Sequence, residues 1–128
     1  MTSATRRAII AALAAARTAT MARYVGNVMG HCAEVSEDAA DRLSAEGIQV
    51  RVVDGCVELD RPVPRWFGAR VHGELARFVN HTWLEADGWL FDGTAAQFNG
   101  DLLTPMPAIL AIRRADAVKH LERAAPAD

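Results

Sequence analysis

The stretch FVNHTWLEADGWLFD, residues 78–92, decides the organisation of the fold. It carries two apolar and aromatic runs on either side of Asp87-Gly88, the pattern of two antiparallel strands joined by a two-residue turn. Such a turn pairs Ala86 with Trp89 and fixes the register of every residue beyond that pair. The sequence therefore predicts a β-hairpin with strands at 78–86 and 89–91.

The predicted register brings a histidine and an aspartate together. Counting outward from the turn sets Trp83 opposite Asp92. His81 then lies opposite Thr94 and becomes a diagonal neighbour of Asp92 on the same face, with carbons about 7 Å apart. An aspartate in that place can fix the tautomer of the histidine and stabilise its protonated form. The hairpin thus holds a candidate base and a carboxylate that orients it.

A candidate nucleophile precedes the hairpin at Cys32. Apolar residues recur three or four apart after it, acidic residues occupy the first turns, and Gly47 supplies a stop, so a helix is predicted from Cys32 to Gly47. A thiol at a helix N-terminus has a lowered pKa because unpaired N–H groups face it. If this helix packs against the hairpin, Cys32 faces His81 in a thiolate–imidazolium pair, with Asp92 behind.

The remaining segments predict a small α+β domain. One domain is expected over 1–128, with an N-terminal helix at 5–23 and a core at 26–112. We further expect a strand pair at 48–52 and 56–59 joined by a turn at Asp54-Gly55, a loop at 60–77 that could cover a site, a strand at 108–112 and a helix-compatible tail at 114–123.

The composition excludes several classes of protein. The chain has 128 residues, of which 51% are hydrophobic and 23% charged, as in soluble globular domains. Fourteen basic and sixteen acidic side chains give a net charge of -2, so no nucleic-acid partner is expected. No stretch is long enough to span a bilayer, and 6–22 is better explained as an Ala-rich amphipathic helix than as a signal peptide. Two cysteines and no need for a disulfide predict a cytoplasmic location.

Three short motifs together resemble a known family. They are Gly30-His31-Cys32-Ala33-Glu34-Val35, His81-Thr82-Trp83-Leu84-Glu85 and Trp89-Leu90-Phe91-Asp92-Gly93-Thr94. Their order, with cysteine on a helix, histidine on a strand and aspartate on the next strand, resembles the transglutaminase-like branch of the papain-like cysteine protease superfamily. The resemblance implies a minimal papain-like fold in which the nucleophile helix packs on a small antiparallel sheet.

The resemblance also implies roles for individual residues. Cys32 would be the nucleophile, His81 the general base and then acid, and Asp92 its orienting group. The Cys32 backbone N–H and the Asn27 side chain would stabilise the oxyanion. The expected substrate cleft includes His31, Trp83 and Gln97. The expected substrate is a peptide or protein, and no cofactor is expected.

Several alternatives remain open at the level of sequence. Acyl transfer to water would give peptide or isopeptide hydrolysis or glutamine deamidation, whereas transfer to an amine would make the chain a transglutaminase. A non-catalytic binding module on the same fold is the alternative from a different class. Zinc is not expected, because the five potential ligands lack paired-ligand spacing; they are His31, Cys32, Cys56, His72 and His81. Cys56 is expected to be a small buried hydrophobe, and His72 and His120 to be exposed and ordinary.

Overall fold

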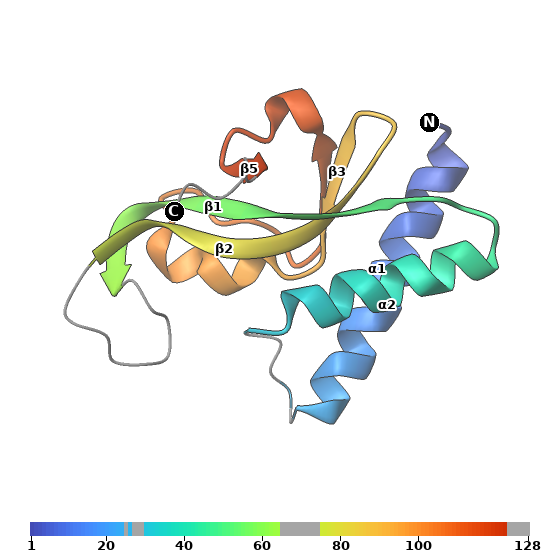
Figure 1. Cartoon of the computed structure of the whole chain (residues 1–128), viewed down its shortest axis with the longest axis horizontal. Coiled ribbons are helices and arrows are strands. Elements are labelled where there is room, and N and C mark those ends of the chain that lie inside the picture. Colours follow the sequence, from blue (N-terminus) through green and yellow to red (C-terminus); the bar gives the residue numbers. More distant parts are fainter. Residues whose placement is uncertain (25, 27–29, 65–74, 123–128) are drawn as a thin grey trace.

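The computed structural model describes residues 1–24, 26, 30–64 and 75–122. It shows two α-helices and one five-stranded antiparallel sheet with strand order β4-β3-β2-β1-β5, which is an α+β architecture (Figure 1). In chain order the elements are α1 (Ser3–Arg23), α2 (Cys32–Ala45), β1 (Arg51–Pro64), β2 (Leu75–Ala86), β3 (Trp89–Asp92), the 3₁₀ helix η1 (Ala95–Asp101), β4 (Leu110–Arg113), the 3₁₀ turn η2 (Arg114–Asp116) and β5 (His120–Glu122).

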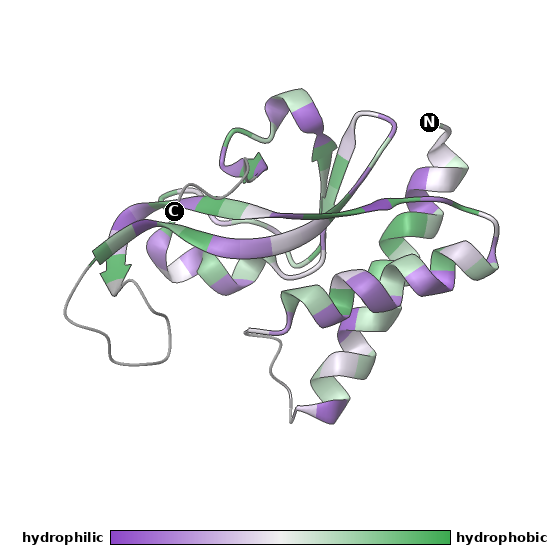
Figure 2. Ribbon diagram, in the orientation of Figure 1, coloured by the Kyte–Doolittle hydropathy of each residue, from purple (hydrophilic) through white to green (hydrophobic). Residues whose placement is uncertain are grey.

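The two α-helices lie together at one end of the long ribbon formed by β1 and β2, whereas β5 and η2 lie beside the middle of that ribbon (Figure 1). Both helices carry polar and apolar stretches in alternation, as expected for helices covered on one side only (Figure 2). Their buried residues meet two residues of the sheet in one core cluster. The members are Ile9, Ala12, Leu13, Ala16, Val35, Ala39, Leu43, Leu84 and Phe91.

Helix α1 covers the core. It begins two residues before the predicted start, with the Thr2 side chain accepting a hydrogen bond from the Thr5 backbone N–H as its N-cap. Ile9, Leu13 and Ala16 are fully buried against α2 and the sheet. Among the described residues, no helix combines the length and apolar character that a membrane span requires.

The hairpin predicted from residues 78–92 is confirmed. Ala86 pairs with Trp89, as the two-residue turn requires, and the ladder continues through Glu85 and Leu90. Asp87 and Gly88 have φ angles of 50° and 77°, the left-handed conformation that a turn of this kind needs at both central positions. The predicted helix after Cys32 is confirmed as α2, and Gly47 follows its end with φ 79°.

The turn predicted at Asp54-Gly55 is wrong. Residues 51–64 form one continuous strand, and Gly55 pairs with His81 on β2 and with Glu122 on β5. A Cβ at position 55 would lie 2.3 Å from the Trp83 ring and 2.4 Å from the Leu121 carbonyl oxygen. The glycine is therefore needed for close approach within the strand, not for a turn.

The segments at 60–77 and 114–123 also differ from expectation. Both ends of the predicted loop are strand, because β1 runs to Pro64 and β2 starts at Leu75; residues 65–74 between them lie outside the described residues. The helix-compatible tail forms no α-helix within its described residues 114–122; it forms η2 and then β5, whose residues pair with β1. The sheet thus extends beyond the expected core limit of 112, because long-range pairing overrides weak local helix preference.

Candidate active site

The hairpin aligns His81 on β2 with Asp92 at the end of β3. His81 Nε2 lies 2.7 Å from Asp92 Oδ2, and both side chains are fully buried. The contact realises the diagonal pairing that the two-residue turn predicts. Thr94 donates its backbone N–H to the other oxygen, Asp92 Oδ1, at 2.9 Å. Asp92 is therefore held by its own turn while it accepts from His81.

Cys32 is the first residue of α2 and is half-buried. The chain reaches it through Gly30, whose φ of 81° is the left-handed conformation that favours glycine. One turn further along α2, the Ser36 hydroxyl donates to the Thr82 carbonyl oxygen at 3.3 Å, which ties the helix to β2 beside His81. The N-terminal backbone N–H groups of α2 and its dipole favour negative charge on the thiol.

The electrostatics of the three residues favour an ion pair. Burial alone would raise the pKa of the Cys32 thiol, but the adjacent His81 imidazole and the polar groups of Thr82 outweigh it and lower the pKa below its ordinary value. Burial would lower the pKa of His81, yet the Asp92 carboxylate, with help from Cys32, raises it to about 9. At neutral pH His81 is therefore an imidazolium facing a thiol that loses its proton readily.

The two nitrogens of His81 have different environments. Nε2 contacts Asp92, whereas Nδ1 has no hydrogen-bond partner of ordinary geometry among the described residues. The thiol of Cys32 interacts with this imidazole electrostatically, and Nδ1 is the ring nitrogen left for it. Phe98 packs edge-on against the ring at 4.9 Å between centroids, and Trp83 lies 6.0 Å away. These aromatic walls limit the access of water to the imidazole.

A second imidazole contacts the same carboxylate. His120 on β5 is 1% exposed, and its Nε2 lies 2.8 Å from Asp92 Oδ2. The expectation that His120 is exposed and has no special role is wrong. Strand β5 pairs with β1, and the buried His120 side chain reaches Asp92 at the end of β3. No local pattern distinguishes His120 in the sequence, since its partner is 28 residues away. Burial would raise the pKa of Asp92, but His81 and His120 together hold it well below its usual range.

A cleft of about 590 Å³ opens beside Cys32. Its wall is formed by residues 75–80 of β2 together with Gly30, Gln97 and Phe98. Gln97 is thus found in the cleft with Cys32, and its Oε1 accepts the Gly30 backbone N–H at 3.3 Å. Leu75 and Phe78 are exposed, so this wall presents apolar surface to solvent.

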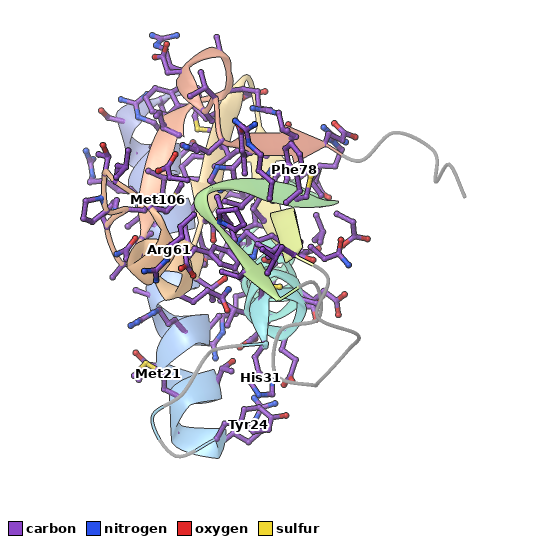
Figure 3. All side chains as sticks on the ribbon, turned by 90° about the vertical axis from the view of Figure 1, so that its left-hand side faces the viewer. Met21, Tyr24, His31, Arg61, Phe78 and Met106 are labelled. Atoms are coloured by element: carbon purple, nitrogen blue, oxygen red, sulfur yellow. The ribbon has the colours of Figure 1, made fainter. Side chains whose placement is uncertain are left out.

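Two residues expected in the cleft lie elsewhere. Trp83 is fully buried in a core cluster with Val53, Leu90 and Ala117, because its ring occupies the space that Gly55 leaves free. His31 points away from Cys32: its ring stacks on Tyr24 with centroids 3.7 Å apart, and its Nδ1 lies 2.8 Å from Glu34 Oε1. Figure 3 shows His31 and Tyr24 next to each other at the end of α1.

Asn27, the expected oxyanion donor, and His72 lie outside the described residues. Cys56 is half-buried rather than buried, and its Sγ lies 3.8 Å from the Leu121 carbonyl oxygen. It pairs with Asn80, one position from His81, so the alternation of side chains along β1 and β2 puts it on the sheet face opposite His81.

His81, Asp92 and His120 also present donor atoms that lie within 4.8 Å of one another, a grouping that could bind a metal ion. Both imidazole Nε2 atoms are at hydrogen-bond distance from one carboxylate oxygen, which requires each to carry a proton. A metal ion would need both nitrogens deprotonated. The distances and the complete burial of the three side chains fit a hydrogen-bonded network.

No protein-family model, curated protein or solved structure matches the chain.

Proposed function

We propose that the chain is a cysteine-dependent enzyme that transfers an acyl group from an amide, with a mechanism like that of the transglutaminase-like papain superfamily. One observation carries the proposal: a cysteine at a helix start lies beside a buried histidine whose other nitrogen is 2.7 Å from a buried aspartate. Nucleophile, base and orienting group are the three parts that such chemistry needs.

The first half of the reaction forms a thioester. The Cys32 thiolate attacks the amide carbonyl carbon, and the carbonyl electron pair moves to oxygen. His81 then gives its Nδ1 proton to the leaving nitrogen as the C–N bond breaks, and the amine departs. Asp92 remains ionised and keeps His81 Nδ1 directed at the reaction.

The oxyanion formed in this step needs hydrogen-bond donors near the N-terminus of α2. The Cys32 backbone N–H has no partner within the helix and is one candidate. The Gln97 carboxamide is a second, since it lines the cleft with Cys32 and is anchored to the Gly30 backbone. The hydrogen bond from the Gly30 backbone to Gln97 Oε1 positions the carboxamide beside the start of α2, and donors that are placed in advance stabilise an oxyanion most effectively.

The second half of the reaction releases the acyl group. A water molecule attacks the thioester while His81 Nδ1 takes its proton, the C–S bond breaks, and the thiolate is restored. The product is a carboxylic acid, which corresponds to peptide or isopeptide hydrolysis, or to deamidation when the carbonyl belongs to a glutamine side chain. The cleft beside Cys32 is open to solvent on its Leu75 and Phe78 wall, which favours water as acceptor over a restricted amine site.

The proposal is tested first by the reactivity of the two thiols. Iodoacetamide labelling of Cys32 and Cys56 is followed by mass spectrometry from pH 5 to about 9 in the wild type and in His81→Ala. We expect rapid labelling of Cys32 well below pH 8 that is lost in His81→Ala, while Cys56 on the opposite face labels alike in both proteins. If Cys32 titrates like a free thiol, near pH 8.5, in both proteins, the enzymatic proposal fails and the binding module takes its place.

The acceptor is then identified with glutamine-containing peptides. Release of ammonia indicates deamidation, new amino termini indicate peptidase activity, and incorporation of a fluorescent primary amine indicates transglutamination. Cys32→Ala should abolish each signal, and Cys56→Ala serves as the matched control that should retain it.

A further inference from the structure

We infer that His120 is a positioning residue for the proposed reaction: it fixes the Asp92 carboxylate so that Oδ2 stays directed at His81. The inference rests on the proposed function, but its test uses the chemistry of Cys32 and needs no substrate. It assigns a role to β5, the strand that the three-residue site leaves unused.

The hydrogen bonds around Asp92 carry the argument. Oδ2 accepts from His81 Nε2 at 2.7 Å and from His120 Nε2 at 2.8 Å, while Oδ1 accepts from the Thr94 backbone at 2.9 Å. An ionised carboxylate can only accept, so both imidazoles must donate their Nε2–H. Three donors on the two oxygens hold the carboxylate in one orientation, and His120 supplies the second of the two on Oδ2. Without His120, the second acceptor site of Oδ2 would be empty in a fully buried environment, which is unfavourable for a carboxylate.

His120 is itself held from several directions. Its backbone pairs with Val57 of β1, and its carbonyl oxygen accepts from Arg114 Nη2 at 2.7 Å. Its ring meets the Trp83 indole edge-on with centroids 5.0 Å apart. A residue anchored through both backbone and ring can keep another group in place with little loss of conformational entropy.

Replacing His120 by a residue without an N–H donor should weaken the Cys32–His81 ion pair. Water would take the place of His120, or the carboxylate would hold its charge less readily because one of its three donors is lost, and either change weakens its attraction for the His81 imidazolium. The titratable groups in contact with this network are His81 from β2, His120 from β5 and, through His81, Cys32 from α2. If His81 is protonated less readily, it stabilises the Cys32 thiolate less, so the Cys32 thiol should keep its proton to higher pH.

The test compares His120→Leu with His120→Gln, two side chains of similar size. Glutamine can place an amide N–H near the position of Nε2, whereas leucine fills the space without a donor. We expect the midpoint of Cys32 labelling to rise by about one pH unit in His120→Leu, which lowers labelling about tenfold at pH values below both midpoints, and to return toward wild type in His120→Gln. Equal midpoints in wild type and His120→Leu, or equal shifts in the two variants, would overturn the inference.

Two controls separate the possible failures. Cys56 pairs with Leu121 of β5, so faster labelling of Cys56 in a variant would show that β5 has detached from β1. Unchanged labelling of Cys56 would show that only the His120 hydrogen bond has been lost. Wild-type ¹⁵N NMR needs no variant: His120 must carry a proton on Nε2, and a neutral His120 protonated only on Nδ1 overturns the inference. If wild-type Cys32 labels without dependence on His81, the proposed function fails instead, whatever His120 does.

Discussion

At the scale of single residues, Gly55 sets how closely the strands approach behind the site. Its missing Cβ is the space occupied by the Trp83 ring and the Leu121 carbonyl, at 2.3 and 2.4 Å from where that atom would be. The Trp83 ring in turn contacts both His81 and His120. One methyl group at position 55 would therefore push against two parts of the same network.

We predict that Gly55→Ala lowers the free energy of unfolding by about 3 kcal/mol, because neither an indole buried on all sides nor a paired backbone carbonyl can move freely. Urea unfolding measures the change. Gly100→Ala is the matched control, since a Cβ there meets nothing within 4 Å and should leave stability within about 0.5 kcal/mol of wild type. A Gly55→Ala protein as stable as this control would contradict the close approach.

At the scale of elements, α1 supports the site without contributing a residue to it. Leu13 is fully buried, and its side chain lies 3.1 Å from where a Cβ on Gly93 would be. Gly93 directly follows Asp92, so α1 packs against the turn that orients the carboxylate. Val35 of α2 lies 3.2 Å from the same hypothetical Cβ position. The two helices thus meet over one residue of the β3 turn.

Leu13→Ala should lower the free energy of unfolding by about 2–5 kcal/mol, the usual cost of removing a fully buried leucine. Arg7→Ala on the same helix provides the comparison, because Arg7 is exposed and its loss should change stability by less than about 0.5 kcal/mol. Thermal or urea unfolding followed by circular dichroism distinguishes them. Equal stability of the two variants would mean that α1 does not cover the core as described.

Some features of these elements could be predicted from the sequence, and others could not. The Asp87-Gly88 turn and α2 follow from neighbouring residues, so the register of the hairpin and the place of Cys32 could be predicted. Asp54-Gly55 carries the same two letters as the true turn, yet contacts with Trp83 and β5 make it the middle of a strand. His120 could not be identified as part of the site, because only pairing between distant strands brings it to Asp92.

At the scale of the whole molecule, the Cys32–His81 pair controls how stability responds to pH. The raised pKa of His81, about 9 against an ordinary 6.5, contributes stability that is present below 6.5 and lost as pH rises through 9. The lowered pKa of Cys32 acts in the opposite direction, since it contributes stability that is present above its ordinary 9.0 and lost as pH falls through the folded value. Between 6.5 and 9 the two contributions oppose each other.

Cys32→Ala removes the contribution of Cys32 and leaves that of His81. Its free energy of unfolding should fall as pH rises above 6.5, with a slope of at most about 1.4 kcal/mol per pH unit, because Asp92 still raises the pKa of His81 and the folded protein keeps a proton that the unfolded chain releases. The pH range of this fall is narrower than the wild-type pKa of His81 implies, because Cys32 no longer contributes to that pKa. The wild type should be nearly flat over the same range. Urea titrations at pH 6.5, 7.5 and about 8.5 measure how the free energy of unfolding changes with pH in the wild type and in Cys32→Ala. Equal slopes in the two proteins would show that the ionisation of Cys32 does not offset that of His81.

The β5 strand has a further consequence for the order in which the molecule assembles. His81 and Asp92 are 11 residues apart within one hairpin, whereas Ser36 and Thr82 are separated by 46 positions and His120 and Asp92 by 28. Hairpins form in about 1–10 μs, and contacts that close longer loops follow later. A newly folding chain is therefore expected to bring His81 and Asp92 together first, and to add Cys32 and His120 to them only when the distant segments arrive.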